Sequence, residues 1–184
     1  MFQYTKGRRQ FISKFALALA GTTFLSSHTY SLFNNVDSPF EGYDPKIGDK
    51  NDLRSHNSRG QGITVSGKVY SKNGVTVRPN AQIKVWHLSP ESSKYNHMGA
   101  FSANESGAYA FKTDMPNRTT GKLPRIYFKI SHGGNVVYTE LIVDANRAYI
   151  SHEHWENHKS LNDNLFPVYK KNLVETEIQF NVTV

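Results

Sequence analysis

Several side chains in the middle of this sequence could bind a metal ion. His87, Tyr95 and His97 lie close together in the chain, and a phenolate oxygen with imidazole nitrogens suits iron, copper or zinc. The alternative is that both histidines are loop or strand-surface residues and that Tyr95 packs with its hydroxyl in a hydrogen bond. The sequence holds no cysteine, which excludes disulfides, thiolate metal sites and cysteine nucleophiles.

A second group of histidines follows in the segment 152–158. If 153–161 form a short helix, His154 and His158 share one face at the i, i+4 spacing that metal ligands use. Two ligands do not make a structural zinc site. The interpretation that we favour for this segment is a hydrated, partly charged loop.

Three charged residues form a third candidate site. Lys122, Arg125 and Glu140 could line a pocket that binds an anion without a metal, or could pair with one another. The alternative is that they are solvated charges on a sheet face, where an exposed pair contributes only about 0–1 kcal/mol.

Length and composition indicate one folded domain. The chain has 184 residues, 38% of them hydrophobic and 20% charged, which is typical of a single globular domain. The formal net charge is +7, but residues 1–27 hold four basic side chains and no acidic one. The remainder has neither a clustered basic face nor a nucleic-acid motif, so we expect no nucleic-acid partner.

Residues 1–27 are typical of a removable signal peptide. A basic start precedes an apolar run that is too short to span a bilayer. Arg8 and Arg9, in Arg-Arg-Gln-Phe-Ile-Ser-Lys, resemble the twin-arginine export signal of bacteria. We therefore expect a periplasmic or extracellular protein with no membrane anchor after signal removal. An ordinary secretory signal with an accidental arginine pair is the alternative.

The elements that must position these side chains are strands. Residues 28–62 are rich in Asn, Asp, Ser, Gly and Pro and predict an irregular N-terminal arm. Beyond them apolar and polar residues alternate, with turn residues between the runs; the runs are 63–70, 81–86, 109–111, 126–130 and 178–184. The pattern predicts an all-β, antiparallel β-sandwich over 63–184. A site would lie on a sheet face, at a sandwich end or under the arm.

Residues 40–145 resemble the intradiol ring-cleavage dioxygenases, such as protocatechuate 3,4-dioxygenase and catechol 1,2-dioxygenase. The similarity lies in ordered motifs, which are Gly-Ile-Thr-Val-Ser-Gly-Lys-Val-Tyr at 62–70, Val-Trp-His at 85–87, Lys-Tyr-Asn-His at 94–97 and Ser-Gly-Ala-Tyr-Ala-Phe-Lys-Thr at 106–113. The resemblance implies the antiparallel sandwich that the alternation predicts independently.

The resemblance also implies a ferric centre. In that family two tyrosinates and two histidines hold Fe(III), and a bound catechol is cleaved by oxygen between its hydroxyl-bearing carbons. Tyr95 matches the first tyrosine ligand. Where the family has His-Ile-His, this chain has Arg-Ile-Tyr at 125–127, and the loop 115–124, where the second tyrosine is expected, has none. Lys122 stands where an arginine is common near the substrate, and Glu140 where a glutamine is usual.

Two hypotheses about function follow. In the first, the chain is an exported intradiol dioxygenase-like enzyme that retains Fe(III) through Tyr95, Tyr127 and recruited histidines, and acts on a catechol-type compound. In the second, it is a non-catalytic binding or structural module, because an arginine cannot donate a lone pair to iron and three of four ligand positions differ. The sequence leaves the oligomeric state open.

Overall fold

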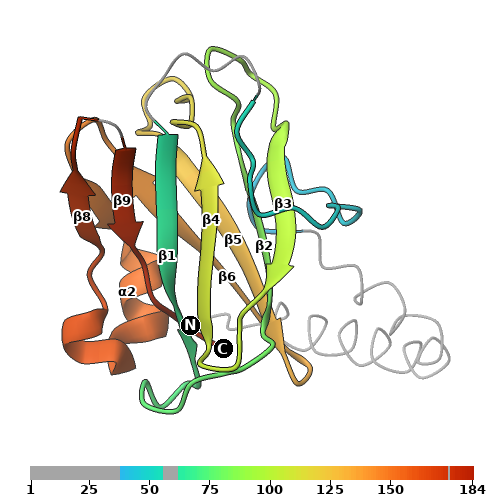
Figure 1. Ribbon diagram of the computed structural model, residues 1–184, viewed down its shortest axis with the longest axis vertical. Coiled ribbons are helices and arrows are strands. Elements are labelled where there is room, and N and C mark those ends of the chain that lie inside the picture. The colour runs from blue at the N-terminus through green and yellow to red at the C-terminus, as the bar shows by residue number, and fades with distance from the viewer. Residues whose placement is uncertain (1–37, 56–61, 174) are drawn as a thin grey trace, which may run out of the picture. The chain divides into compact units, whose positions relative to one another are not determined.

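The computed structural model describes residues 38–55, 62–173 and 175–184, and these belong to one compact unit, Ser38–Val184. The predicted signal peptide, with Arg8 and Arg9, lies outside the described residues. Two sheets pack face to face in this unit (Figure 1). The all-β sandwich predicted from the alternation is confirmed.

The first sheet is antiparallel throughout. Its strands, in spatial order, are β3 (His97–Ser102), β2 (Gln82–His87), β5 (Arg125–His132), β6 (Asn135–Val143) and β7 (Ala148–Ile150). The second sheet is mixed. Its strands are β4 (Ala108–Thr113), β1 (Gly62–Tyr70), β9 (Glu175–Gln179), β8 (Val168–Lys171) and β10 (Val182–Thr183).

The core lies between the sheets and follows the two-residue period of the strands. On β5, Ile126, Phe128 and Ile130 are fully buried, while the residues between them are partly exposed. Successive side chains of a strand point to opposite faces, so one set enters the core and the other faces outward. This alternation decides which side chains can meet at a site.

Two details of the second sheet differ from the prediction. β1 pairs in parallel with β9 and β10, so the sandwich is not wholly antiparallel. The run 178–184 is also not one strand. Between β9 and β10, the Lys68 N–H donates to the side-chain oxygen of Asn181 (2.9 Å), so a side chain replaces a backbone acceptor and interrupts the ladder.

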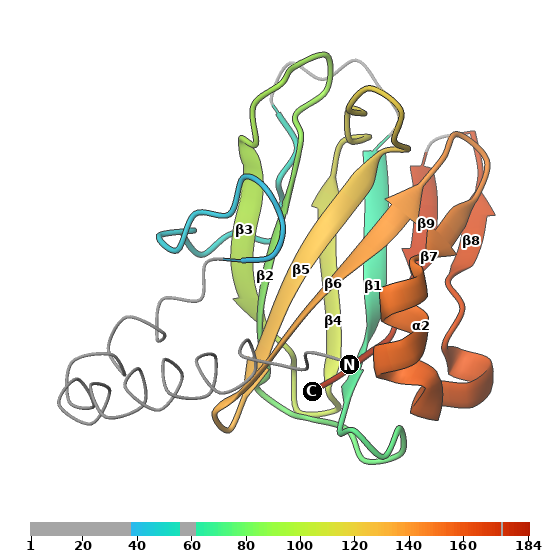
Figure 2. The same ribbon diagram turned by 180° about the vertical axis from the view of Figure 1, so that it is seen from behind.

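The helix α2 (His152–His158), followed by the 3₁₀ helix η1 (Lys159–Asn164), lies at one side of the sandwich, beside β6 and near the edge strand β8 (Figure 2). The Ser151 side chain caps α2 by accepting from the His154 N–H (3.1 Å). The loop that the sequence favoured for this segment is therefore wrong. The reason is that His154 and His158 form the buried face of the helix, with rings 4.2 Å apart.

These two buried histidines are held by threonines. His154 Nδ1 lies 2.7 Å from the Thr139 hydroxyl, and His158 Nδ1 accepts the Thr183 N–H (3.0 Å). Because Nδ1 of His158 accepts, the proton of the neutral ring sits on Nε2. Nε2 of His158 therefore offers no lone pair to a metal.

The arm, in its described residues 38–55, runs along β3 and β2 (Figure 2). Asp49 forms a parallel bridge with Ala100 of β3, and Asp52 does so with Lys112 of β4. Such pairing satisfies backbone groups that an edge strand would otherwise expose. None of the helices among the described residues combines the length and apolar composition that crossing a bilayer requires.

Because His154 and His158 are buried in α2, we expect the stability of the folded protein to fall in acid. Burial lowers the pKa of His158 to about 4 and that of His154 to about 3, whereas the unfolded chain binds these protons near pH 6.5. The stabilisation is complete above pH 6.5, and the free energy of unfolding falls as pH decreases from 6.5 towards 4. Urea denaturation at several pH values measures this slope.

A substitution separates this effect from general acid denaturation. His158→Gln should make the dependence of unfolding free energy on pH shallower between pH 6.5 and 4, whatever its effect on stability at pH 7. The matched control is His152→Gln, since His152 lies exposed on the same helix. An equal slope in His158→Gln and the parent would contradict the assignment.

Candidate functional site

Trp86 of β2 and Tyr127 of β5 lie opposite each other on the outer face of the first sheet. Their rings are 5.8 Å apart. Each directly adjoins a residue that points into the sandwich, namely His87 and Phe128, both fully buried. The two-residue period thus brings an indole and a phenol together outside the core.

The arm completes this group of rings. Phe40 stacks on Tyr127 with centroids 4.7 Å apart and planes 18° apart, and Tyr43 lies 5.0 Å from Trp86. The Trp86 indole N–H donates to the backbone carbonyl of Glu41 (2.9 Å). This bond fixes the arm over the sheet. We call Phe40, Tyr43, Trp86, Tyr95 and Tyr127 the aromatic cluster.

Tyr95 enters the cluster from the loop between β2 and β3. Its ring is 6.3 Å from that of Tyr127, and its hydroxyl donates a long hydrogen bond to Glu41 Oε2 (3.5 Å). The ring lies against Gly42, where φ is +74° and any Cβ would overlap it. Only glycine fits this approach of arm and ring.

The structure therefore brings two of the predicted residues, Tyr95 and Tyr127, to one place. The pKa of Tyr95 is raised, mainly by burial and to a smaller extent by the nearby Glu41 carboxylate. The pKa of Tyr127 is raised to about 12, mainly by burial and to a smaller extent by Tyr95. A free tyrosine is already protonated at neutral pH, and these surroundings keep both phenols protonated to a still higher pH.

Arg125 and Glu140 lie beside Tyr127 and pair with each other. Glu140 is the cross-strand neighbour of Tyr127, and its carboxylate accepts a charge-assisted hydrogen bond from Arg125 Nη1. Glu140 is buried and Arg125 is partly exposed. Lys122 is exposed in the preceding loop, where its backbone N–H donates to Thr119 (3.0 Å). Of the three charged residues of the third candidate site, Arg125 and Glu140 therefore form an ion pair.

The predicted histidines lie on the other side of the sheet. His87 and His97 face each other across β2 and β3, with rings 4.9 Å apart, and both are buried. His87 Nδ1 donates to the Leu88 carbonyl (2.7 Å), and Nε2 accepts from the Thr113 hydroxyl (2.6 Å). Burial lowers the pKa of His87 to about 3. The structure thus separates these histidines from the two phenols.

The residues present do not fit the ferric centre that the resemblance implies. The described face offers two phenols and the Glu41 carboxylate, but an arginine where an imidazole should donate a lone pair. In the described parts of the chain, no three His, Asp or Glu side chains gather to bind a metal ion. His87 and His97 lie on the inner face of the sheet, so they cannot bind a metal ion together with Tyr95.

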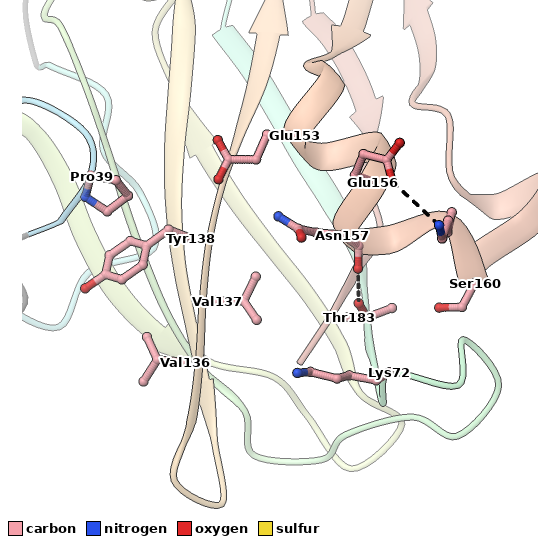
Figure 3. Close-up of a pocket in the computed structure, with 11 residues that line it drawn as sticks. Pro39, Lys72, Val136, Val137, Tyr138, Glu153, Glu156, Asn157, Ser160 and Thr183 are labelled. Atoms are coloured by element: carbon pink, nitrogen blue, oxygen red, sulfur yellow. Dashed lines mark hydrogen bonds and ion pairs between the residues drawn. The ribbon is translucent and has the colours of Figure 1, made fainter. Parts of the chain in front are cut away.

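A cavity of about 520 Å³ lies near α2. Figure 3 shows β6, with Val136, Val137 and Tyr138, on one side of it and α2 on the other. Its charged groups are on exposed residues; they are Lys72, Glu153, Glu156 and Lys159. The cavity shares Tyr138 with the surroundings of Tyr43, whose ring is 6.3 Å away. It is open and contains no catalytic arrangement.

Several residues of the site were not predicted from the sequence. Phe40 and Glu41 belong to the arm, where composition indicated only irregular structure. Outside the aromatic cluster, Ser89 and Asp114 contact His97 and carry no motif of their own. The position of Gly42 before Tyr43 was the one available signal, since a glycine in a turn permits a close approach.

Comparison with known proteins gives a consistent result. No protein-family model matches the chain, and no curated protein matches its sequence. Among solved structures, the dioxygenase domain of a carbohydrate-binding fusion from Streptomyces sp. SirexAA-E is similar at 16% identity and a TM-score of 0.60, covering 79% of this chain and 94% of that one.

Two further structures agree. The intradiol ring-cleavage dioxygenase from Tetranychus urticae has 16% identity and a TM-score of 0.55, with 79% of this chain and 90% of that chain covered. The 3-chlorocatechol 1,2-dioxygenase from Rhodococcus opacus 1CP has 12% identity and a TM-score of 0.56, with 86% and 77% covered. The chain therefore has the fold of the intradiol ring-cleavage dioxygenases, as its motifs indicate.

Proposed function

We propose that this chain is an exported intradiol dioxygenase-like protein that binds a catechol-type compound at its aromatic cluster and lacks the family's two-histidine ferric centre. The observation that carries the proposal is the outer face of β5. It presents Arg125 and Tyr127 where the resemblance expects histidines, and Arg125 is bound to Glu140. A guanidinium is always charged and has no lone pair to donate.

The aromatic cluster supports an aromatic ligand. Phe40 already stacks on Tyr127 at 4.7 Å, so this face accepts a planar ring. A catechol ring would take the place of Phe40. Its hydroxyls would have the Glu41 carboxylate and the Tyr95 hydroxyl as partners, and aromatic stacking favours such a ring. One of the similar structures is named for a substituted catechol, which supports this class of ligand.

Exchange with Phe40 gives a direct test of ligand binding. If the ligand replaces this ring, Phe40→Ala should bind 4-methylcatechol several-fold more tightly than the parent, because no side chain competes. Tyr127→Ala should bind it more weakly. Isothermal titration with the full chain measures both. The matched control is Phe166→Ala, since Phe166 is exposed elsewhere. Equal affinity in all four proteins would refute the assigned position.

Iron content tests the absence of the ferric centre. Protein purified from iron-replete cells should be colourless, whereas an iron-bound tyrosinate absorbs visible light. Arg125→His with Tyr127→His should bind Fe(III) more tightly than the parent, since both side chains point away from the core and imidazole can ligate iron. Metal analysis and the visible spectrum of the folded variant provide the measurement.

The control for that variant is Lys129→His with Ser131→His. It places two histidines at the same spacing on the outer face of β5, but closer to the turn between β5 and β6 than positions 125 and 127 are. Similar iron affinity in both variants would mean that Tyr95 does not act as the resemblance implies. A coloured parent that bleaches in Tyr95→Phe would instead establish the iron enzyme as the function.

Export is proposed from residues 1–27. Arg8→Lys with Arg9→Lys preserves the charge but removes the pair that a twin-arginine receptor reads, so the full-length precursor should stay in the cytoplasm. Lys6→Arg with Lys14→Arg is the matched control and should leave export intact. Fractionation and immunoblotting measure the distribution. Export of the Arg8→Lys/Arg9→Lys precursor at the parent's level would indicate an ordinary secretory signal.

A further inference from the structure

A chain of hydrogen bonds joins Ser89, His97 and Asp114 where β2 ends and β3 begins. Ser89 Oγ lies 2.9 Å from His97 Nδ1, and His97 Nε2 lies 3.0 Å from Asp114 Oδ2. All three residues are buried. The aromatic cluster is on the opposite face of the sheet, so the proposed function does not use them.

The contacts define where the protons lie. Asp114 Oδ2 accepts from the backbone N–H (2.8 Å) and the hydroxyl (3.0 Å) of Ser55, which favours the ionised carboxylate. A carboxylate can only accept, so His97 Nε2 carries a proton, and in the neutral ring Nδ1 has a free lone pair. The Asn96 N–H donates to Ser89 Oγ (3.2 Å). Nδ1 of this neutral tautomer can only accept, so the Ser89 hydroxyl donates to it.

This is the arrangement of roles in a serine hydrolase triad. A base nitrogen faces the hydroxyl, and the other ring nitrogen donates to a carboxylate that fixes the tautomer. The two ring nitrogens are exchanged relative to the usual triad. Each nitrogen of a neutral imidazole can be either donor or acceptor, so the exchange preserves both roles.

We propose that Ser89 is a nucleophile for small, activated acyl esters, with His97 as general base and Asp114 as a positioning residue. Ser89 Oγ attacks the ester carbonyl and its proton moves to His97 Nδ1. The proton then leaves with the alcohol, and water hydrolyses the acyl-serine by the same route. Ser89 is only 7% exposed, which restricts the substrate to a small acyl group.

Covalent labelling of the full chain tests the proposal. A small fluorophosphonate should form one adduct on Ser89, located by peptide mass spectrometry. Ser89→Ala should abolish this adduct. His97→Asn should slow labelling by about 100-fold or more, which is the range for loss of a general base. The rate of p-nitrophenyl acetate hydrolysis should fall in Ser89→Ala and His97→Asn together with the rate of labelling.

The control variant is Ser93→Ala, because Ser93 lies exposed in the same loop and should not affect labelling. Asp114→Asn tests positioning: it should slow labelling and shift its pH profile, a result that a purely structural role would not produce. Circular dichroism confirms that each variant is folded. Failure of the folded parent to label at Ser89, or equal labelling after urea denaturation, would overturn the proposal.

Discussion

The two-residue period of β2 and β5 is the constraint on which both candidate sites depend. Trp86 and His87 are neighbours in the chain but face opposite sides of the first sheet. Tyr127 and Phe128 divide in the same way. Aromatic rings therefore collect under the arm, and the buried histidine network collects at the end of the sandwich. The aromatic cluster and the histidine network stay on opposite faces of the sheet. Only a one-residue shift of strand register would exchange the faces, and that shift would expose the core.

The same period explains what the sequence predicts. Alternation located most strands and placed Arg125 and Tyr127 on one outer face. It missed β3, β6, β7 and β8. For β3 the reason is that the arm covers Met98 and Ala100 while the opposite face packs into the sandwich. A strand that is covered on both sides loses its polar residues and its alternation. The arm itself depends on the bond from the Trp86 indole to the Glu41 carbonyl, and a backbone acceptor leaves no trace in composition.

The histidines show a related difficulty. His154 and His158 form the buried face of α2, although their polarity favoured a solvated loop. Their partners, Thr139 and Thr183, come from distant strands. A buried polar side chain is tolerated when it is hydrogen-bonded, and sequence spacing does not show such partners. Asp114 reaches His97 by the same kind of non-local contact.

The departures from the ferric ligand set are consistent with one another electrostatically. A bound metal cation would hold Tyr95 and Tyr127 as phenolates. Without one, burial keeps both phenols protonated, and the Tyr95 hydroxyl needs an acceptor, which Glu41 provides. Arg125 introduces a positive charge that requires a carboxylate, and Glu140 stands where the resemblance expects a glutamine. Glu140 is buried, and a buried charge is tolerated only with a partner, so its carboxylate and the Arg125 guanidinium are best understood as one coupled change that adds no net charge to this face.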